Sequence, residues 1–166
     1  MDKVGITESN LNNLSGEYEM FADYEYRKEV DKKASQEKLT NSDINFYRKV
    51  TNKPFLKDST AQYSIKLESS KTIATFIFSK NNIPFDTIKI LTVIIRNGFY
   101  YLDNTKTTCH GIPYLFGGCQ QTKMRLGLSN KGELIVNTAT DNSGAFLLFF
   151  WAGQQYNTCY FFKKKV

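Results

Sequence analysis

The stretch TIKILTVIIRNGFYYLDN, residues 87–104, decides the fold. Its first ten residues are rich in isoleucine and valine, which favour strands over helices. Asn97-Gly98 follows at once and separates this run from a second apolar run. Asn-Gly between two apolar runs predicts a β-hairpin, because both central residues of a type I′ turn need positive φ. The middle of the chain is therefore predicted to be antiparallel β-structure.

Similar patterns extend outward from this hairpin in both directions. Residues 61–69 alternate between apolar and polar, and residues 71–80 are β-branched and aromatic on both faces. Residues 123–129 alternate again, and glycine-containing turns are predicted at 130–132, 141–144 and 153–157, with 104–122 irregular. The chain is therefore predicted to be all-β, an antiparallel up-and-down barrel or sandwich of about eight to nine strands. The polar stretch 28–43 is either a short helix after the first strand or a long loop.

The first strand of this fold is predicted over residues 16–27, which begin GEYEMFADYEY. Three tyrosines fall on its even positions, and the odd positions are mostly acidic. Because successive side chains of a strand point to opposite faces, one face is tyrosine-rich and the other acidic. The acidic face is expected to lie in solvent, although carboxylates two residues apart also suit glycoside hydrolysis. These carboxylates are Glu17, Glu19, Asp23 and Glu25.

Length and charge limit the number of domains, the class of partner and the location that the sequence allows. The chain has 166 residues, which suits a single β-barrel domain over 14–166 behind a flexible polar segment, 1–13. The net charge of +6 is scattered, which is typical of a solvated surface or of a protein with an acidic partner, and no nucleic-acid partner is expected. No run of 18 apolar residues is present to span a membrane. Export to the periplasm or cell surface is favoured, with a signal or lipid-anchor segment missing from this chain, and a cytoplasmic location stays open.

Three cysteines and one histidine limit the possible chemistry. A disulfide between Cys109 and Cys119 would close a short glycine-rich loop in an exported protein, and three free thiols are the cytosolic alternative. These two cysteines, His110 and Cys159 would supply the four ligands of a zinc site, but their spacing lacks paired knuckles. His110 is also the only base for cysteine-dependent hydrolysis. We expect no metal and no cofactor.

The aromatic content is the strongest functional signal. The chain has 13 phenylalanines, 10 tyrosines and one tryptophan. A buried tyrosine needs a partner for its hydroxyl, and ligand cavities combine aromatic walls with a few polar groups. The aromatic face therefore either lines a ligand cavity or rings the ends and outside of the barrel. The predicted wall residues of a cavity are Tyr18, Tyr24, Tyr26, Phe76, Phe78, Met124, Phe149 and Trp151.

Residues 14–19, LSGEYE, resemble the opening of lipocalin-like proteins. That family begins its first barrel strand with a glycine, one spacer and usually a tryptophan, and here Tyr18 follows Gly16 in the tryptophan position. The family also carries a basic residue on its last strand over that ring, and Lys163 is the candidate. The strands predicted from 61 to 163 fit a calycin-type barrel in order and number. The resemblance implies a non-enzymatic carrier of a small hydrophobic ligand.

Two other functions stay open. A small basic β-domain also suits an inhibitor or immunity protein that binds an acidic partner protein. The third function is a hydrolase that uses His110 with a cysteine, or the acidic strand.

Overall fold

The computed structural model describes residues 3–29, 35–39, 43–112, 116–146 and 150–165. Within these ranges the chain forms a 12-stranded antiparallel sheet with two short helices, which confirms the all-β prediction. None of the described helices is long and apolar enough to cross a bilayer. The elements are β1 (Lys3–Val4), η1 (Leu11–Leu14), β2 (Gly16–Glu19), β3 (Tyr24–Glu29), β4 (Ser35–Lys38), α1 (Phe46–Thr51), β5 (Tyr63–Ser69), β6 (Ile73–Lys80), β7 (Ile83–Arg96), β8 (Phe99–Leu102), β9 (Lys106–Ile112), β10 (Phe116–Ser129), β11 (Leu134–Phe146) and β12 (Phe150–Phe162).

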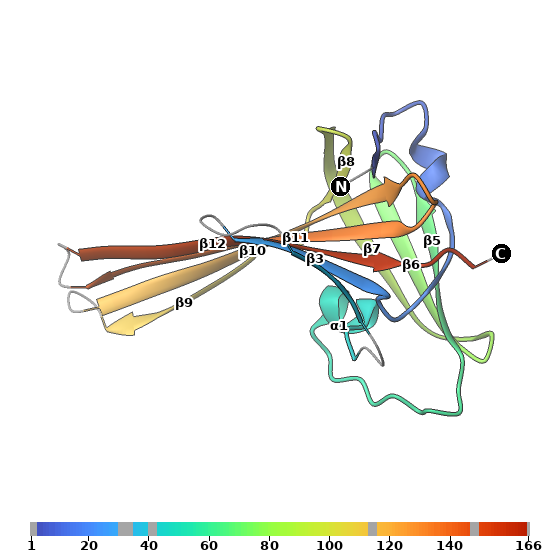
Figure 1. Cartoon of the computed structure of the whole chain (residues 1–166), viewed down its shortest axis with the longest axis horizontal. Helices are drawn as coiled ribbons and strands as arrows, with labels where there is room; N and C mark the ends of the chain where they lie inside the picture. The colour runs from blue at the N-terminus through green and yellow to red at the C-terminus, as the bar shows by residue number, and fades with distance from the viewer. Residues whose placement is uncertain (1–2, 30–34, 40–42, 113–115, 147–149, 166) are drawn as a thin grey trace.

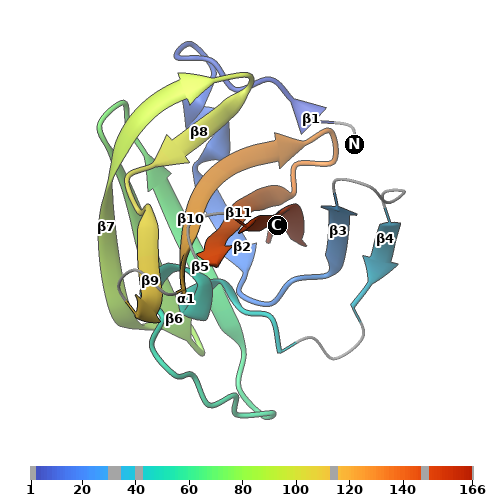
Figure 2. The same ribbon diagram turned by 90° about the vertical axis from the view of Figure 1, so that its left-hand side faces the viewer.

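The strands follow the order β2-β5-β6-β7-β8-β10-β11-β12-β3-β4, with β1 and β9 paired to β10. The sheet is strongly curled (Figure 2), but its strand order has two ends, so it is not a closed barrel; the sequence predicted a barrel or a sandwich. Residues 163–165, which follow β12, pair with the free edge of β2 over a short length. The amide of Glu19 donates to the carbonyl of Lys163, and that of Lys165 to the carbonyl of Glu17, both at 2.8 Å. These bonds flank a single bridge between Tyr18 and Lys164.

The strand predicted over 16–27 is two strands in different parts of the sheet. β2 ends at Glu19 and pairs with β5, whereas β3 begins at Tyr24 and pairs with β12. Tyr18 and Met20 are buried in the interior, and Glu17 and Glu19 are exposed. Because the chain bends over residues 20–23, the even-numbered residues of the two strands do not share one face. Tyr18 lies in the main core, whereas Tyr24 and Tyr26 pack against a second, smaller cluster.

The interior of the curled sheet is filled by aromatic side chains around α1. Phe46, the first residue of α1, is fully buried, with its ring centroid 5.1 Å from Phe76, 6.2 Å from Phe78 and 5.6 Å from Phe162. The helix begins here because the Asn45 side chain accepts a hydrogen bond from the amide of residue 48 at 2.8 Å. The sequence predicts either a short helix or a long loop over 28–43, but residues 35–38 form β4 and α1 begins later, at Phe46.

Four strands continue beyond the body of the protein as a flat extension (Figure 1). We call this extension the arm; it comprises β9 and residues 116–122 of β10, 140–146 of β11 and 150–156 of β12. The turns predicted at 141–144 and 153–157 are strand instead, and the segment predicted to be irregular is the β9–β10 hairpin. The number of strands therefore exceeds the eight to nine expected.

Residues 3–11 of the N-terminal segment lie against the sheet, and the flexibility expected over 1–13 stays a prediction. β1 pairs with the end of β10 through Lys3 and Val4. Ile6 and Leu11 are buried, with 2% and 4% of their surface exposed. Their burial adds apolar contacts to the main core.

Candidate functional site

A cavity of about 670 Å³ lies where the arm joins the body, between α1 and one face of the sheet. We call it the cationic cavity, because four of its side chains are basic and Asp43 is the one carboxylate among its described lining residues. Its volume falls within the range of sites for small organic ligands. The basic residues are Arg27, Arg48, Lys49 and Lys106.

The floor of the cavity consists of hydroxyl and amide side chains from neighbouring strands. Thr138 of β11 pairs with Thr158 of β12 and with Met124 of β10, and Thr140 pairs with Thr122. Threonine favours strands because it is β-branched, and residues in register across neighbouring strands share one face of a sheet. The threonines therefore line one continuous polar surface. The remaining polar residues of the lining are Asn45, Asn52, Asn104, Thr108 and Gln120.

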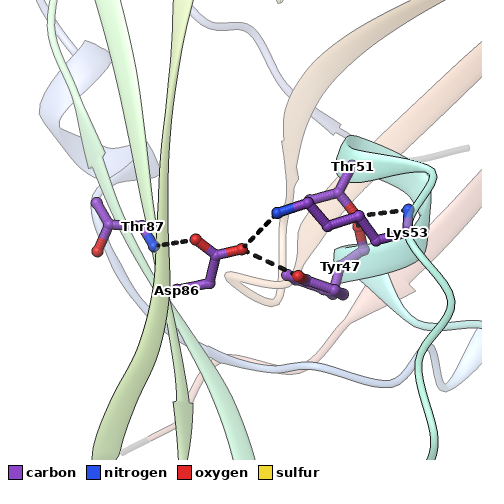
Figure 3. Close-up of polar contacts among 5 residues, drawn as sticks. All are labelled: Tyr47, Thr51, Lys53, Asp86 and Thr87. Carbon is purple, nitrogen blue, oxygen red and sulfur yellow. Dashed lines mark hydrogen bonds and ion pairs between the residues drawn. The ribbon is translucent and has the colours of Figure 1, made fainter.

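Helix α1 forms the opposite wall and is fixed to β7 by Asp86 (Figure 3). The Tyr47 hydroxyl donates to Asp86 Oδ2 at 2.9 Å, and the Lys53 ammonium lies 3.4 Å from the same oxygen. The Thr87 amide donates to Asp86 Oδ1 at 2.8 Å. The hydrogen bond from Tyr47 is the main reason that the pKa of Asp86 is lowered. This contact holds the helix, and with it the basic side chains of the wall, against the sheet.

The basic side chains of the cavity are only partly neutralised. Arg27 forms an ion pair with Glu25 at 2.9 Å. Across the described residues, Arg48, Lys49 and Lys106 form no ion pair within 4.0 Å. Burial lowers the pKa of both Lys49 and Lys106, because an ammonium loses hydration there. At Lys49 the charge of Glu25 opposes this effect only in part, and its Nζ lies 4.1 Å from the centroid of the Tyr160 ring. An anion placed in the cavity would add a counter-charge.

Two polar atoms of the lining also lack partners within the described structure. The hydroxyl oxygen of Thr138 and the side-chain oxygen of Asn104 are buried without a hydrogen bond. A buried polar atom without a hydrogen-bond partner lowers the stability of the fold. The position of these two atoms beside a cavity therefore indicates that water or a ligand group forms the missing hydrogen bond. The cavity therefore offers both cationic and neutral hydrogen-bonding groups.

The predicted wall residues lie in three different places. Tyr18, Phe76 and Phe78 are fully buried in the interior, where Tyr18 donates to the carbonyl of residue 14 at 2.8 Å and burial raises its pKa to about 12. Tyr24 and Tyr26 pack in a second cluster with Phe99, Ile135, Cys159 and Phe161. Met124 is the one of the six described side chains that lines the cationic cavity. Phe149 and the side chain of Trp151 lie outside the described residues.

The basic residue over the Tyr18 ring is the neighbour of the one named from the resemblance. Lys164 Nζ lies 5.9 Å from the Tyr18 ring centroid, within reach of a cation–π interaction. Lys163 instead pairs with Asp23 at 2.7 Å. This difference of one residue follows from the bridge that pairs Tyr18 with Lys164.

The cysteines do not meet a catalytic or metal-binding partner. Cys109 and Cys119 are joined by a disulfide between β9 and β10, so neither is a free thiol. Cys159 is buried and receives a hydrogen bond from Asn137. His110 is in register with residue 152 of β12, three strands away, and Cys159 lies seven positions further along β12, so His110 and Cys159 are separated by more than roughly 23 Å. Across the described residues, no group of three or more His, Cys, Asp or Glu is placed to hold a metal ion.

Sequence reasoning missed the cavity itself. Arg48 and Lys49 lie in a short apolar patch and carry no motif, and Lys106 lies near the start of the stretch 104–122 that is predicted to be irregular. The threonines at 138, 140 and 158 have the even spacing of one strand face, but the sequence does not say which face they share with α1.

Comparisons with protein-family models, curated proteins and solved structures found no match to this chain.

Proposed function

We propose that this protein is a binding protein that holds a small organic anion in the cationic cavity. The observation that carries the proposal is that Arg48, Lys49 and Lys106 face a threonine floor and form no ion pair with any residue that the structure describes. Charge-assisted hydrogen bonds from arginine and lysine are the strongest that a protein offers to carboxylate and phosphate. Threonine hydroxyls and asparagine amides would bond the neutral oxygens of the same ligand.

The polarity of the cavity favours an anionic ligand over the hydrophobic one that the lipocalin resemblance implies. The interior in which a hydrophobic ligand would sit contains Phe46, Phe76 and Phe78, all fully buried. The resemblance implies a carrier, and we keep that part of it in the proposal; Lys164, which lies over the Tyr18 ring, is one residue from the Lys163 that the resemblance named. The disulfide is consistent with an exported carrier, since such bonds persist in oxidising compartments.

Isothermal titration of the purified protein with pyrophosphate and with citrate tests this proposal. We expect binding of one anion per chain, and we expect Lys49→Met and Lys106→Met each to weaken it by about tenfold. The matched control is Lys131→Met, because Lys131 is exposed in the turn between β10 and β11, outside the cavity. Binding of the neutral probe N-phenyl-1-naphthylamine instead of the anions, with no effect of the lysine variants, would refute the proposal.

Proton uptake provides a second readout of the same site. An anion beside Lys49 would raise the pKa that burial has lowered, so binding at alkaline pH should take up protons. The apparent heat of binding should then differ between buffers of different ionisation enthalpy. The Lys49→Met variant should lose that difference, whereas the Lys131→Met control should keep it.

The second candidate function is recognition of an acidic partner protein. The same three cations would then pair with carboxylates of the partner, which suits an inhibitor or immunity protein. Titration with free anions distinguishes the two functions. A protein of the second class binds neither pyrophosphate nor citrate. It binds a polyglutamate peptide instead, with an affinity that falls as salt is added and on Lys106→Met.

A further inference from the structure

The cationic cavity contains a buried oxygen that only a hydrogen-bond donor can satisfy. The side chain of Asn104 donates from Nδ2 to the sulfur of Met124 at 3.6 Å. This contact sets the orientation of the amide, because exchanging its nitrogen and oxygen would place two acceptors against each other. Asn104 Oδ1 is then buried without a hydrogen-bond partner among the residues that the structure describes. A carbonyl oxygen accepts and does not donate, so an anion that carries no donor leaves this atom unsatisfied.

A second buried oxygen lies beside the same methionine. Thr138 of β11 is in register with Met124 of β10, and its hydroxyl oxygen is also buried without a described hydrogen-bond partner. A threonine hydroxyl can both donate and accept. Asn104 and Thr138 together therefore match a hydroxyl group on the ligand, which has the same capacity to donate and to accept.

Lys106 lies further along the same surface. It is in register with Thr122, which is two residues from Met124 on β10 and shares its face of the sheet. Neighbours on one face of a strand are about 7 Å apart. A ligand that meets both Lys106 and the two buried oxygens therefore needs an uncharged, hydroxyl-bearing part beyond its anionic group.

The charge of the cavity matches a phosphate monoester. Of its four basic residues, Arg27 is paired with Glu25, and Asp43 offsets one further positive charge. Two positive charges therefore remain among the described lining residues. A phosphate monoester carries about −1.5 to −2 at neutral pH, which compensates them more fully than a single carboxylate does.

The described lining favours a sugar over a nucleotide as the uncharged part. Nucleotide bases are commonly held by stacking on aromatic rings. Tyr160 is the one aromatic residue in the described lining, and Lys49 Nζ lies 4.1 Å from its ring centroid. An ammonium over the ring takes the place that a base would occupy, whereas threonine hydroxyls and amides suit the hydroxyl groups of a sugar.

We propose that the anion bound in the cationic cavity is a phosphorylated sugar. Its phosphate lies against Arg48, Lys49 and Lys106, and its hydroxyl groups bond Asn104 Oδ1 and the Thr138 hydroxyl. A volume of about 670 Å³ accommodates a ligand of this size. This inference rests on the proposed function and narrows its ligand from small organic anions in general to one class.

Isothermal titration of the intact chain with glucose 6-phosphate and with cyclohexyl phosphate at neutral pH tests the inference. Both ligands carry one phosphate on a six-membered ring system, but cyclohexyl phosphate has no hydroxyl groups. We expect glucose 6-phosphate to bind about tenfold more tightly. Equal affinities would overturn the inference, and so would tighter binding of adenosine monophosphate than of glucose 6-phosphate. This comparison needs no variant, so it decides the matter even where a substitution hinders folding.

Two variants assign the preference to the two buried oxygens. Asn104→Leu and Thr138→Val keep the approximate shape of each side chain and remove its oxygen. Each should lower the ratio of the affinity for glucose 6-phosphate to that for cyclohexyl phosphate by about fivefold. The matched control is Thr75→Val, because Thr75 is a strand threonine on β6 outside the cavity lining, and it should keep the wild-type ratio. An unchanged ratio in both cavity variants would refute the assignment.

The results separate this inference from the proposed function. If pyrophosphate and citrate bind but glucose 6-phosphate and cyclohexyl phosphate bind alike, the cavity is an anion site and the sugar assignment alone fails. If none of these anions binds, the proposed function fails together with the inference.

Discussion

Truncation of Phe46 tests the claim that α1 fills the interior of the curled sheet. The ring is fully buried, with centroids of Phe76, Phe78 and Phe162 within 5.1 to 6.2 Å. A buried phenylalanine removes at least about 150 Å² from water, which at about 25 cal/mol per Å² is worth about 4 kcal/mol. Loss of the ring contacts and the cavity left behind act in the same direction, so Phe46→Ala should lower the free energy of unfolding by about 4–5 kcal/mol.

Urea denaturation followed by far-UV circular dichroism measures this loss, with the disulfide kept oxidised. The matched control is Phe85→Ala, the same truncation at a side chain that is 44% exposed, which should cost about 2 kcal/mol. Leu56→Ala, at a side chain that is 94% exposed, should change the stability by less than about 0.5 kcal/mol. A loss of less than about 2 kcal/mol for Phe46→Ala, with an unchanged dependence on urea, would show that the interior is not packed around this ring.

Three further changes test other contacts. Tyr18→Phe removes a buried hydroxyl from a backbone carbonyl and should lower the unfolding free energy by about 1–3 kcal/mol in the same urea assay; no loss would contradict that bond. Asp86→Asn should lower the free energy of unfolding by about 0.5–1 kcal/mol at neutral pH. Because Tyr47 lowers the pKa of Asp86, the contribution is fully present above the ordinary aspartate pKa of about 4 and is lost as the pH falls through the lowered pKa, so variant and wild type should converge below that pKa. Replacing Cys109 and Cys119 by serine opens a loop with a sequence separation of 10, worth about 2.7 kcal/mol in the chain-entropy account. Amide exchange in β9 should then accelerate by about a hundredfold, and unchanged exchange would refute the stabilising role of the disulfide.

Local turn chemistry made much of the body predictable. Asn97 and Gly98 have φ values of 53° and 72°, as the Asn-Gly signal requires, and they join β7 to β8. Asn81 and Asn82 also have positive φ and join β6 to β7. In both hairpins the residues that tolerate positive φ lie between two apolar runs, so a local rule suffices to predict them.

The arm and the cavity were not predictable in the same way. Gly144 and Gly153 look like turn residues along the chain, but in the arm they pair with Gly118 and Ser143 in continuous strands. Glycine marks a turn and a strand of small residues equally well, and the choice depends on the partner strand. The same limit applies to the cavity, since its basic wall and its threonine floor meet only after α1 has packed against the sheet.

The division of the first strand into β2 and β3 has a consequence for synthesis of the chain. β3 is complete at Glu29, yet its partner β12 begins at Phe150, and β2 meets residues 163–165 later still. At about 5–20 residues per second, a ribosome needs roughly 6 to 25 s to make the intervening stretch of about 120 residues. During that time the tyrosines of β3 have no partner strand on the β12 side. The β12-side edge of β3 is therefore unpaired in the nascent chain until β12 has been made.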